Sequence, residues 1–187
     1  MTAARSCGEC TLCCTLLRVD ELRKRGGAPC RQLRAPPAAP GCGIHPTRPG
    51  VCRAYACLWL SGGLDEADRP DRLGAVLDVA TEGLVTRLRV HEASPGAYER
   101  SARLREIVAS YRESMPVRIS DVSRAGDPDA PVRELGPAGA ELRVEGEWIV
   151  RMDGACELER RRLPWLERTL RRVSLAWRAR KLRGYGD

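Results

Sequence analysis

The sequence is poor in aromatic residues and contains no phenylalanine. Only 4% of its 187 residues are aromatic, although 43% are hydrophobic. A buried core is therefore expected to consist mostly of leucine, valine and alanine. The length fits one domain of ordinary size or two small ones.

Long hydrophobic runs are also missing. No stretch of eighteen consecutive apolar residues occurs, which excludes a membrane-spanning helix. Residues 1–7 lack the apolar stretch of a secretory signal. We therefore expect a cytoplasmic protein with no membrane partner. In such a reducing compartment, clustered cysteines indicate metal or redox chemistry rather than a disulfide scaffold.

Familiar catalytic signatures are absent as well. The sequence has no H-E-x-x-H, Walker or dinucleotide-binding motif. Its two histidines are His45 and His91. No clear acid–base partner is recognisable, so no catalytic residue is predicted. We interpret His91, at the end of an expected strand, as a surface or packing residue.

Cysteine, by contrast, is abundant and unevenly placed. Eight of the nine cysteines precede residue 58, namely Cys7, Cys10, Cys13, Cys14, Cys30, Cys42, Cys52 and Cys57. Cys13 and Cys14 are adjacent, and adjacent residues rarely form a relaxed disulfide with each other. The pattern favours a metal site, with disulfides and unliganded thiols as the alternatives. Cys156 stands apart and is interpreted as a buried or spare thiol.

The order of these residues resembles a known family. The opening Cys-x2-Cys-x2-Cys-Cys is followed by Cys30, by Cys42-Gly-Ile-His45, by Arg48-Pro49 and by Cys52-Arg53 with Cys57. Together they are similar to the YkgJ-type cysteine-cluster family, also called the CxxCxxCC domain, which is described as zinc- or iron-chelating. The similarity covers residues 6–60. It implies that all eight cysteines ligate metal, and it implies no settled reaction.

Several metals fit eight thiolates. Two zinc ions with four ligands each satisfy them, as does one iron–sulfur cluster with a further ion. Residues 1–60 hold nine Lys or Arg against three Asp or Glu, a net charge of +6. Eight thiolates and two divalent ions would reduce this to about +2, which favours the bound state without choosing the metal. His45 is either a further ligand or a packing residue. Arg48 and Arg53 either donate to cysteine sulfurs and carbonyls or lie on the surface.

The N-terminal pattern predicts a helix that begins near Ser6. Ser6 and Glu9 have the spacing of a capping box. An apolar face would lie opposite a face of four cysteines, namely Cys7, Cys10, Cys13 and Cys14. Gly8 weakens this prediction, and an irregular metal knuckle is the alternative. We expect the helix terminus and the surrounding positive charge to lower the thiol pKa values.

Beyond residue 60 the pattern alternates between strands and helices. It predicts strands over 73–80 and 84–92, a helix over 97–115, a strand over 116–122, a loop over 124–140, and strands over 141–144 and 148–152. The expected fold is α+β, with the cysteine-rich metal-binding region of residues 1–60 packed with a small antiparallel sheet and flanking helices from residues 61–187. We expect the two parts to share one core.

The C-terminal segment is strongly basic. Residues 160–183 hold ten Lys or Arg against one Glu, a net charge of +9. A helix over 163–182 is predicted, with its apolar residues on one face. In one interpretation this face packs on the sheet and the arginines face solvent. In the other, residues 160–183 dock to nucleic acid or to an acidic protein.

The function we expect is binding of zinc or iron by the cysteine cluster, at a site that is mainly structural or metal-handling. One alternative is an iron- or iron–sulfur-dependent enzyme. The second is a nucleic-acid-binding module that uses the C-terminal basic helix.

Overall fold

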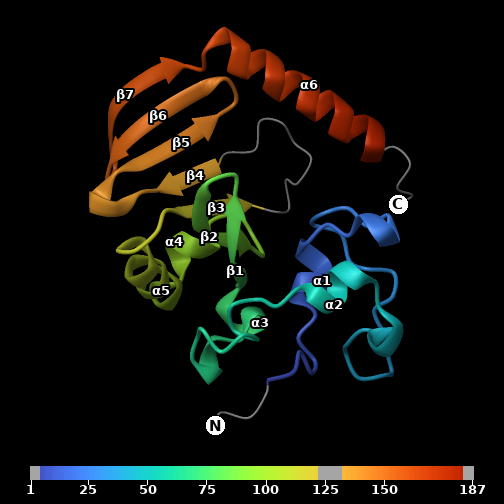
Figure 1. Ribbon diagram of the computed structural model, residues 1–187. Coiled ribbons are helices and arrows are strands. Elements are labelled where there is room, and N and C mark those ends of the chain that lie inside the picture. Colours follow the sequence, from blue (N-terminus) through green and yellow to red (C-terminus); the bar gives the residue numbers. More distant parts are fainter. Residues whose placement is uncertain (1–4, 122–131, 183–187) are drawn as a thin grey trace.

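A computed structural model describes residues 5–121 and 132–182 and arranges them around a seven-stranded sheet (Figure 1). The strands follow one another in the sheet in chain order. They are β1 (Ala75–Glu82), β2 (Val85–Glu92), β3 (Val117–Asp121), β4 (Val132–Leu135), β5 (Glu141–Glu145), β6 (Trp148–Asp153) and β7 (Cys156–Arg162). The α+β class is confirmed, with a larger sheet than expected.

Most of the described helices are short, and the two longer ones lie beyond residue 100. They are α1 (Leu12–Leu16), α2 (Gly50–Ala54), α3 (Pro70–Leu73), α4 (Ala97–Arg100), α5 (Ala102–Arg112) and α6 (Trp165–Leu182). Single 3-10 turns are η1 (Asp20–Leu22), η2 (His45–Thr47), η3 (Glu66–Asp68) and η5 (Pro137–Gly139). Figure 1 places α4 and α5 on one side of β1 and the cysteine-rich region on the other.

The first two strands form the predicted hairpin. β1 and β2 pair antiparallel along their whole length, from Ala75 opposite Glu92 to Glu82 opposite Val85. Gly83 begins the turn between them with a φ of +64°, a conformation that glycine adopts without steric cost. The two strand-like segments and the glycine between them were therefore a sound guide to the pairing.

The sheet is not purely antiparallel, so this part of the prediction is wrong. β2 and β3 run parallel, whereas the other neighbouring strands pair antiparallel. A parallel pair needs a long crossover connection, and the helical segment between β2 and β3 provides it. The predicted single helix is divided into α4 and α5 at Ser101, whose hydroxyl accepts a hydrogen bond from the Leu104 N–H at 3.1 Å and caps α5.

The main core lies between α5 and the first strands. Its fully buried members include Leu77, Leu88, Leu104, Val108 and Val117. They come from β1, β2, β3 and α5, so the crossover helix covers this face of the sheet. The core is aliphatic, as the shortage of aromatic residues predicted.

A second buried cluster fastens the cysteine-rich region to the sheet. Leu16, Cys57 and Trp59 pack with Val76 of β1, which points to the opposite face from Ala75 and Leu77. The Leu58 N–H donates to the Leu77 carbonyl at 2.7 Å. The chain before β1 is thus held against the side of the strand that α5 leaves open.

Two strands were missed in the sequence. β4 lies in the predicted loop over 124–140, of which residues 124–131 are outside the described ranges. β7 is exposed at every position and so has no apolar alternation to reveal it. It forms because it pairs with β6 at the edge of the sheet, where charged residues are common. Cys156, expected to be a buried or spare thiol, is exposed at the start of this strand.

The C-terminal helix is present, but its apolar face is not packed on the sheet. Leu166, Leu170, Val173 and Trp177 are each more than half exposed. The interpretation that this face packs on the sheet is therefore wrong. Within the described ranges, no helix combines the length and the apolar character that crossing a bilayer requires.

Replacing Leu104 with alanine tests the position of the main core. Leu104 is 0% exposed, so the variant should lower the free energy of unfolding by about 2–5 kcal/mol through the cavity it leaves. Leu84→Ala is the control, because Leu84 is fully exposed and its loss should change stability by about 0.5 kcal/mol or less. Urea unfolding followed by circular dichroism measures both, and equal losses would contradict this core.

Candidate metal centre

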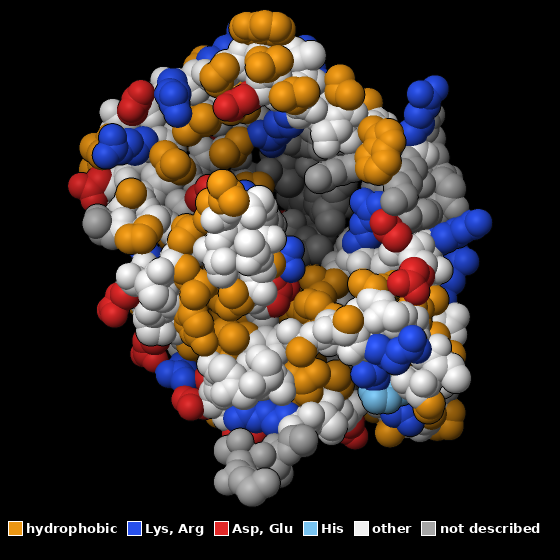
Figure 2. Space-filling view, in the orientation of Figure 1, with side chains coloured by type: hydrophobic (Ala, Val, Ile, Leu, Met, Phe, Trp, Pro, Cys, Tyr) orange, Lys and Arg blue, Asp and Glu red, His pale blue; other side chains and the backbone are white. Residues whose placement is uncertain are grey.

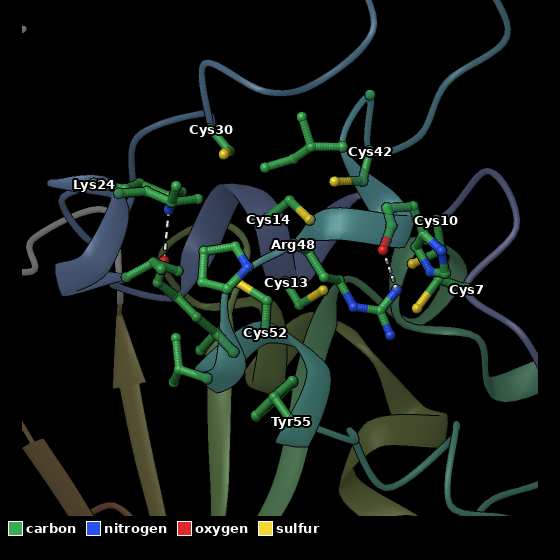
Figure 3. A pocket seen from close by; sticks show the side chains of 18 of the residues that line it. Cys7, Cys10, Cys13, Cys14, Lys24, Cys30, Cys42, Arg48, Cys52 and Tyr55 are labelled. Carbon is green, nitrogen blue, oxygen red and sulfur yellow. Dashed lines mark hydrogen bonds between the residues drawn. The ribbon is translucent and has the colours of Figure 1, made fainter.

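The eight N-terminal cysteines line a single cavity. Its volume is about 590 Å³. The lining includes every predicted ligand, Cys7, Cys10, Cys13, Cys14, Cys30, Cys42, Cys52 and Cys57. Figure 3 shows Cys7 and Cys10 at one end of the cavity and Cys30 toward the other. Residues fifty positions apart in sequence are therefore brought to one place.

A tight turn and α1 position the first four cysteines. The Cys10 N–H donates to the Cys7 carbonyl at 2.9 Å, and Gly8 between them has a φ of +52°. The turn has the irregular knuckle form, so the predicted helix from Ser6 is wrong. The helix begins only at Leu12, and it carries Cys13 and Cys14.

Short backbone contacts position the other four cysteines. The Cys30 N–H donates to the Cys14 carbonyl at 3.1 Å, which ties the loop to α1. An isolated bridge joins Cys42 to Leu33. Cys52 lies on α2, and Cys57 follows it in the buried cluster on β1. The loops between these points contain few hydrogen bonds of the helix or strand type. Each cysteine is therefore positioned by its own nearby contacts.

All nine cysteines are free thiols. The alternative of disulfides is therefore not realised in this arrangement. Within residues 5–121 and 132–182, no three His, Cys, Asp or Glu side chains are grouped closely enough to hold one ion as they stand. The donor chemistry fits zinc and iron, since thiolates prefer such metals. Convergence on an ion would need the sulfurs to change position, for example by rotation between staggered χ1 angles.

Burial is the main influence on the pKa of four of the thiols. It raises the pKa of Cys7, Cys10, Cys52 and Cys57. The predicted lowering by positive charge is therefore wrong for these four. Protons on these thiols must be released when a metal binds.

Cys14 differs from the other thiols. A hydrogen bond from the Cys13 thiol lowers the pKa of Cys14 to about 7, and Lys24 and Arg48 add to this effect against the opposing effect of burial. The same hydrogen bond, together with burial, raises the pKa of Cys13. Cys14 is thus the thiol that ionises most readily in this pair and a natural first ligand for a cation.

Lys24 and Arg48 are two of the basic residues that line the cavity with the thiols. Lys24 is only 6% exposed, and its ammonium donates to the carbonyls of Thr15, Leu17 and Arg25 at 2.9, 2.6 and 3.0 Å. Burial lowers the pKa of Lys24, and nearby cysteine thiolates act in the opposite direction. Lys24 was not among the predicted site residues, although it is one of two lysines among 32 basic residues.

Arg48 lies among the sulfurs in Figure 3. Its Nε is buried and has no hydrogen-bond partner, whereas its Nη1 donates to the His45 carbonyl at 3.5 Å. Arg53 is exposed and donates from Nη1 to the Arg48 carbonyl at 2.6 Å. His45 is an exposed residue in the cavity lining. Arg48 is the arginine that can donate to the thiolates, and Arg53 supports its backbone.

A polar network connects the cavity to the sheet. Tyr55 lines the cavity, and its hydroxyl donates to Asp78 Oδ2 at 3.0 Å. Arg89 Nε donates to Asp78 Oδ1 at 2.6 Å, and His91 Nε2 lies 3.3 Å from Oδ2. Ser120 Oγ is 3.4 Å from His91 Nδ1. His91 is therefore part of a polar cluster on the sheet and does not line the cavity.

Asp78 was the central residue that sequence reasoning missed in this network. It is 3% exposed in the middle of β1. A single acidic residue within the apolar run Val76–Ala80 was the available signal, because a buried carboxylate requires partners. Its partners come from β2 and from the cysteine-rich region, so the network adds a polar connection to the apolar contact at Val76.

Comparisons with known proteins gave no relative. No protein-family model, no curated protein and no solved structure matches the chain. The similarity to the cysteine-cluster family therefore rests on the spacing of the cysteines and their neighbours alone.

Asp78→Asn tests the network through its pH dependence. Burial alone would raise the pKa of Asp78, but His91 and Arg89 outweigh it, so the pKa is lowered in the folded protein. At neutral pH the variant should lose about 1–3 kcal/mol of stability, because Arg89 and Tyr55 lose a charged acceptor.

The sign of the pH effect follows from the lowered pKa. The carboxylate stabilises the fold fully above its unfolded-state pKa of about 3.9 and loses this effect as the pH falls through the folded value. The stability difference between wild type and Asp78→Asn should therefore shrink below pH 4, about the unfolded value. Urea unfolding across this range measures it, and a constant difference would refute the assignment.

Proposed function

We propose that this protein binds zinc or iron through its eight N-terminal cysteines, at a site that is mainly structural or metal-handling. The observation that carries the proposal is the convergence of eight free thiols on one cavity. Unpaired thiols in such number, from five separate pieces of chain, are typical of sulfur-ligated metals. Hydrophobic packing alone does not explain why all eight of these positions are cysteine.

The loops between the cysteines support a structural role for the metal. Residues 26–43 contain no helix or strand of regular length, and most of them are at least partly exposed. Such a segment gains little from apolar burial to offset its conformational entropy. A structural metal contributes about 10–16 kcal/mol in small zinc domains, which is ample to order it.

The charges around the cavity support the same proposal. Several thiolates at one place repel one another unless cations balance them. Lys24 and Arg48 supply fixed positive charge, and a metal would supply the rest. The unpartnered Nε of Arg48 is a donor that a metal-bound thiolate could satisfy.

Elemental analysis of serine variants tests the proposal. Protein purified without air should contain zinc or iron, and Cys14→Ser and Cys52→Ser should each lower the metal content per chain, because each removes a ligand. Cys156→Ser is the matched control, since Cys156 is exposed on β7 and does not line the cavity. A folded, metal-free wild type in which all nine thiols titrate would contradict the proposal, as would equal metal content in all variants.

Arg48→Met tests the part that the guanidinium with the buried Nε plays. The variant should bind the metal about tenfold more weakly, because a group that orients or neutralises the ligands is lost. Competition with a chromophoric chelator measures the affinity. Arg31→Met is the control, because Arg31 is exposed and does not line the cavity. If the metal affinity were unchanged in both variants, Arg48 would not contribute to metal binding.

The size of the cavity favours a second candidate, an iron- or iron–sulfur-dependent enzyme. About 590 Å³ is within the range of roughly 300–1,000 Å³ typical of small-molecule pockets. Leu17, Leu22 and Ile44 give part of the wall an apolar surface. Broad visible absorption with acid-labile sulfide would favour this candidate, whereas a colourless protein that contains zinc would favour the structural site.

A further inference from the structure

The C-terminal helix α6 carries a row of large apolar side chains in solvent. Leu166, Leu170, Val173 and Trp177 follow one another at steps of four and three residues, so they share one face. They are 53%, 60%, 62% and 61% exposed, and Trp165 beside them is 70% exposed. Figure 2 shows hydrophobic side chains gathered along the edge of the molecule where α6 lies. A continuous row of this kind is typical of a binding surface.

The other side of the helix is fastened to the sheet. Arg168 Nη1 lies 3.3 Å from Glu147 Oε2, and the Arg172 guanidinium pairs with the same carboxylate. Leu163, two residues before the helix, is buried, and its N–H donates to the Glu147 carbonyl at 2.8 Å. On the helix, Arg168 and Arg172 lie opposite the apolar row. A partner can therefore contact α6 only on the face that carries the apolar row. A partner with a broad surface fits this face better than one with a groove that would enclose the helix.

The charge of the helix narrows the choice of partner. Residues 165–182 hold six Lys or Arg and one Glu. A second copy of the chain would bring two helices of like charge together, which opposes self-association. Nucleic acid would balance the charge but leave the apolar row in water, since its backbone offers no apolar surface. An anionic lipid surface satisfies both features, because it accepts apolar side chains below a layer of negative headgroups.

We propose that α6 binds peripherally to anionic lipid, with its apolar row at the boundary of the headgroups and acyl chains. Tryptophan is favoured at this depth, and Trp177 belongs to the row, while Trp165 is exposed beside it at the start of the helix. The sequence-based expectation of no membrane partner considered only spanning segments and secretory signals, and the proposal departs from it. It is independent of the cysteine site.

Vesicle flotation of the full chain tests the proposal. Wild-type protein should float with vesicles of phosphatidylcholine mixed with phosphatidylglycerol and much less with phosphatidylcholine alone. Raising the salt concentration should weaken the binding. Leu170→Glu with Val173→Glu should weaken it by about tenfold or more, since apolar contact is lost and negative charge is added.

Leu84→Glu is the matched control. Leu84 is fully exposed in the β1–β2 turn, so one leucine-to-glutamate change of the same kind is made outside α6. Circular dichroism must show that each variant is folded. Wild-type protein that does not float, or a double variant that floats as well as the control, would overturn the proposal. The proposal would also be overturned if light scattering showed that the wild type and the control are dimers and the double variant is a monomer. RNA binding at physiological salt that the double variant retains would overturn it as well.

Discussion

The packing of residues 57–59 against β1 is the interaction on which the rest of the structure depends. Cys57, Trp59 and Leu16 are buried against Val76. Between them, the Leu58 N–H donates a hydrogen bond to the Leu77 carbonyl. Arg5 strengthens this junction by donating to the carbonyls of Trp59 and Leu64 at 2.8 and 2.7 Å. Because β1 also belongs to the main core, this strand gives an otherwise irregular region a rigid support.

The support explains how eight cysteines can meet around one cavity. Cys57 is part of the apolar cluster itself, and α1 contributes both Leu16 to the cluster and two thiols to the cavity. Tyr55 has a similar double role, since it lines the cavity and bonds to buried Asp78. The wall of the cavity nearest the sheet is therefore firmly held, whereas the loops that carry Cys30 and Cys42 depend on a few backbone contacts.

The features that the sequence predicted well are local ones. The β1–β2 hairpin, the β5–β6 pair and α6 follow from alternation, helical periodicity and turn residues. The sulfur-rich cavity is not local in this sense, since Cys7 and Cys57 lie fifty positions apart. By contrast, β7 has no pattern of its own and forms because β6 offers it a partner. Burial likewise overrode expectation at the thiols, where it raises the pKa of four cysteines despite the basic surroundings.

Tertiary placement also decided which polar residues matter. Lys24 and Asp78 are ordinary residues in the sequence, and their roles follow from burial at 6% and 3% exposure. Single-sequence reasoning has no measure of such burial before the fold is known. The parallel pairing of β2 with β3 is a similar case, because it depends on how α4 and α5 cross the sheet.

X-ray absorption at the zinc and iron edges is the sharpest test of the proposal that the eight thiols hold metal. We expect a first shell dominated by sulfur, with a metal–sulfur distance of about 2.3 Å for zinc. A first shell of oxygen and nitrogen alone, or no bound zinc or iron in a folded protein, would contradict it.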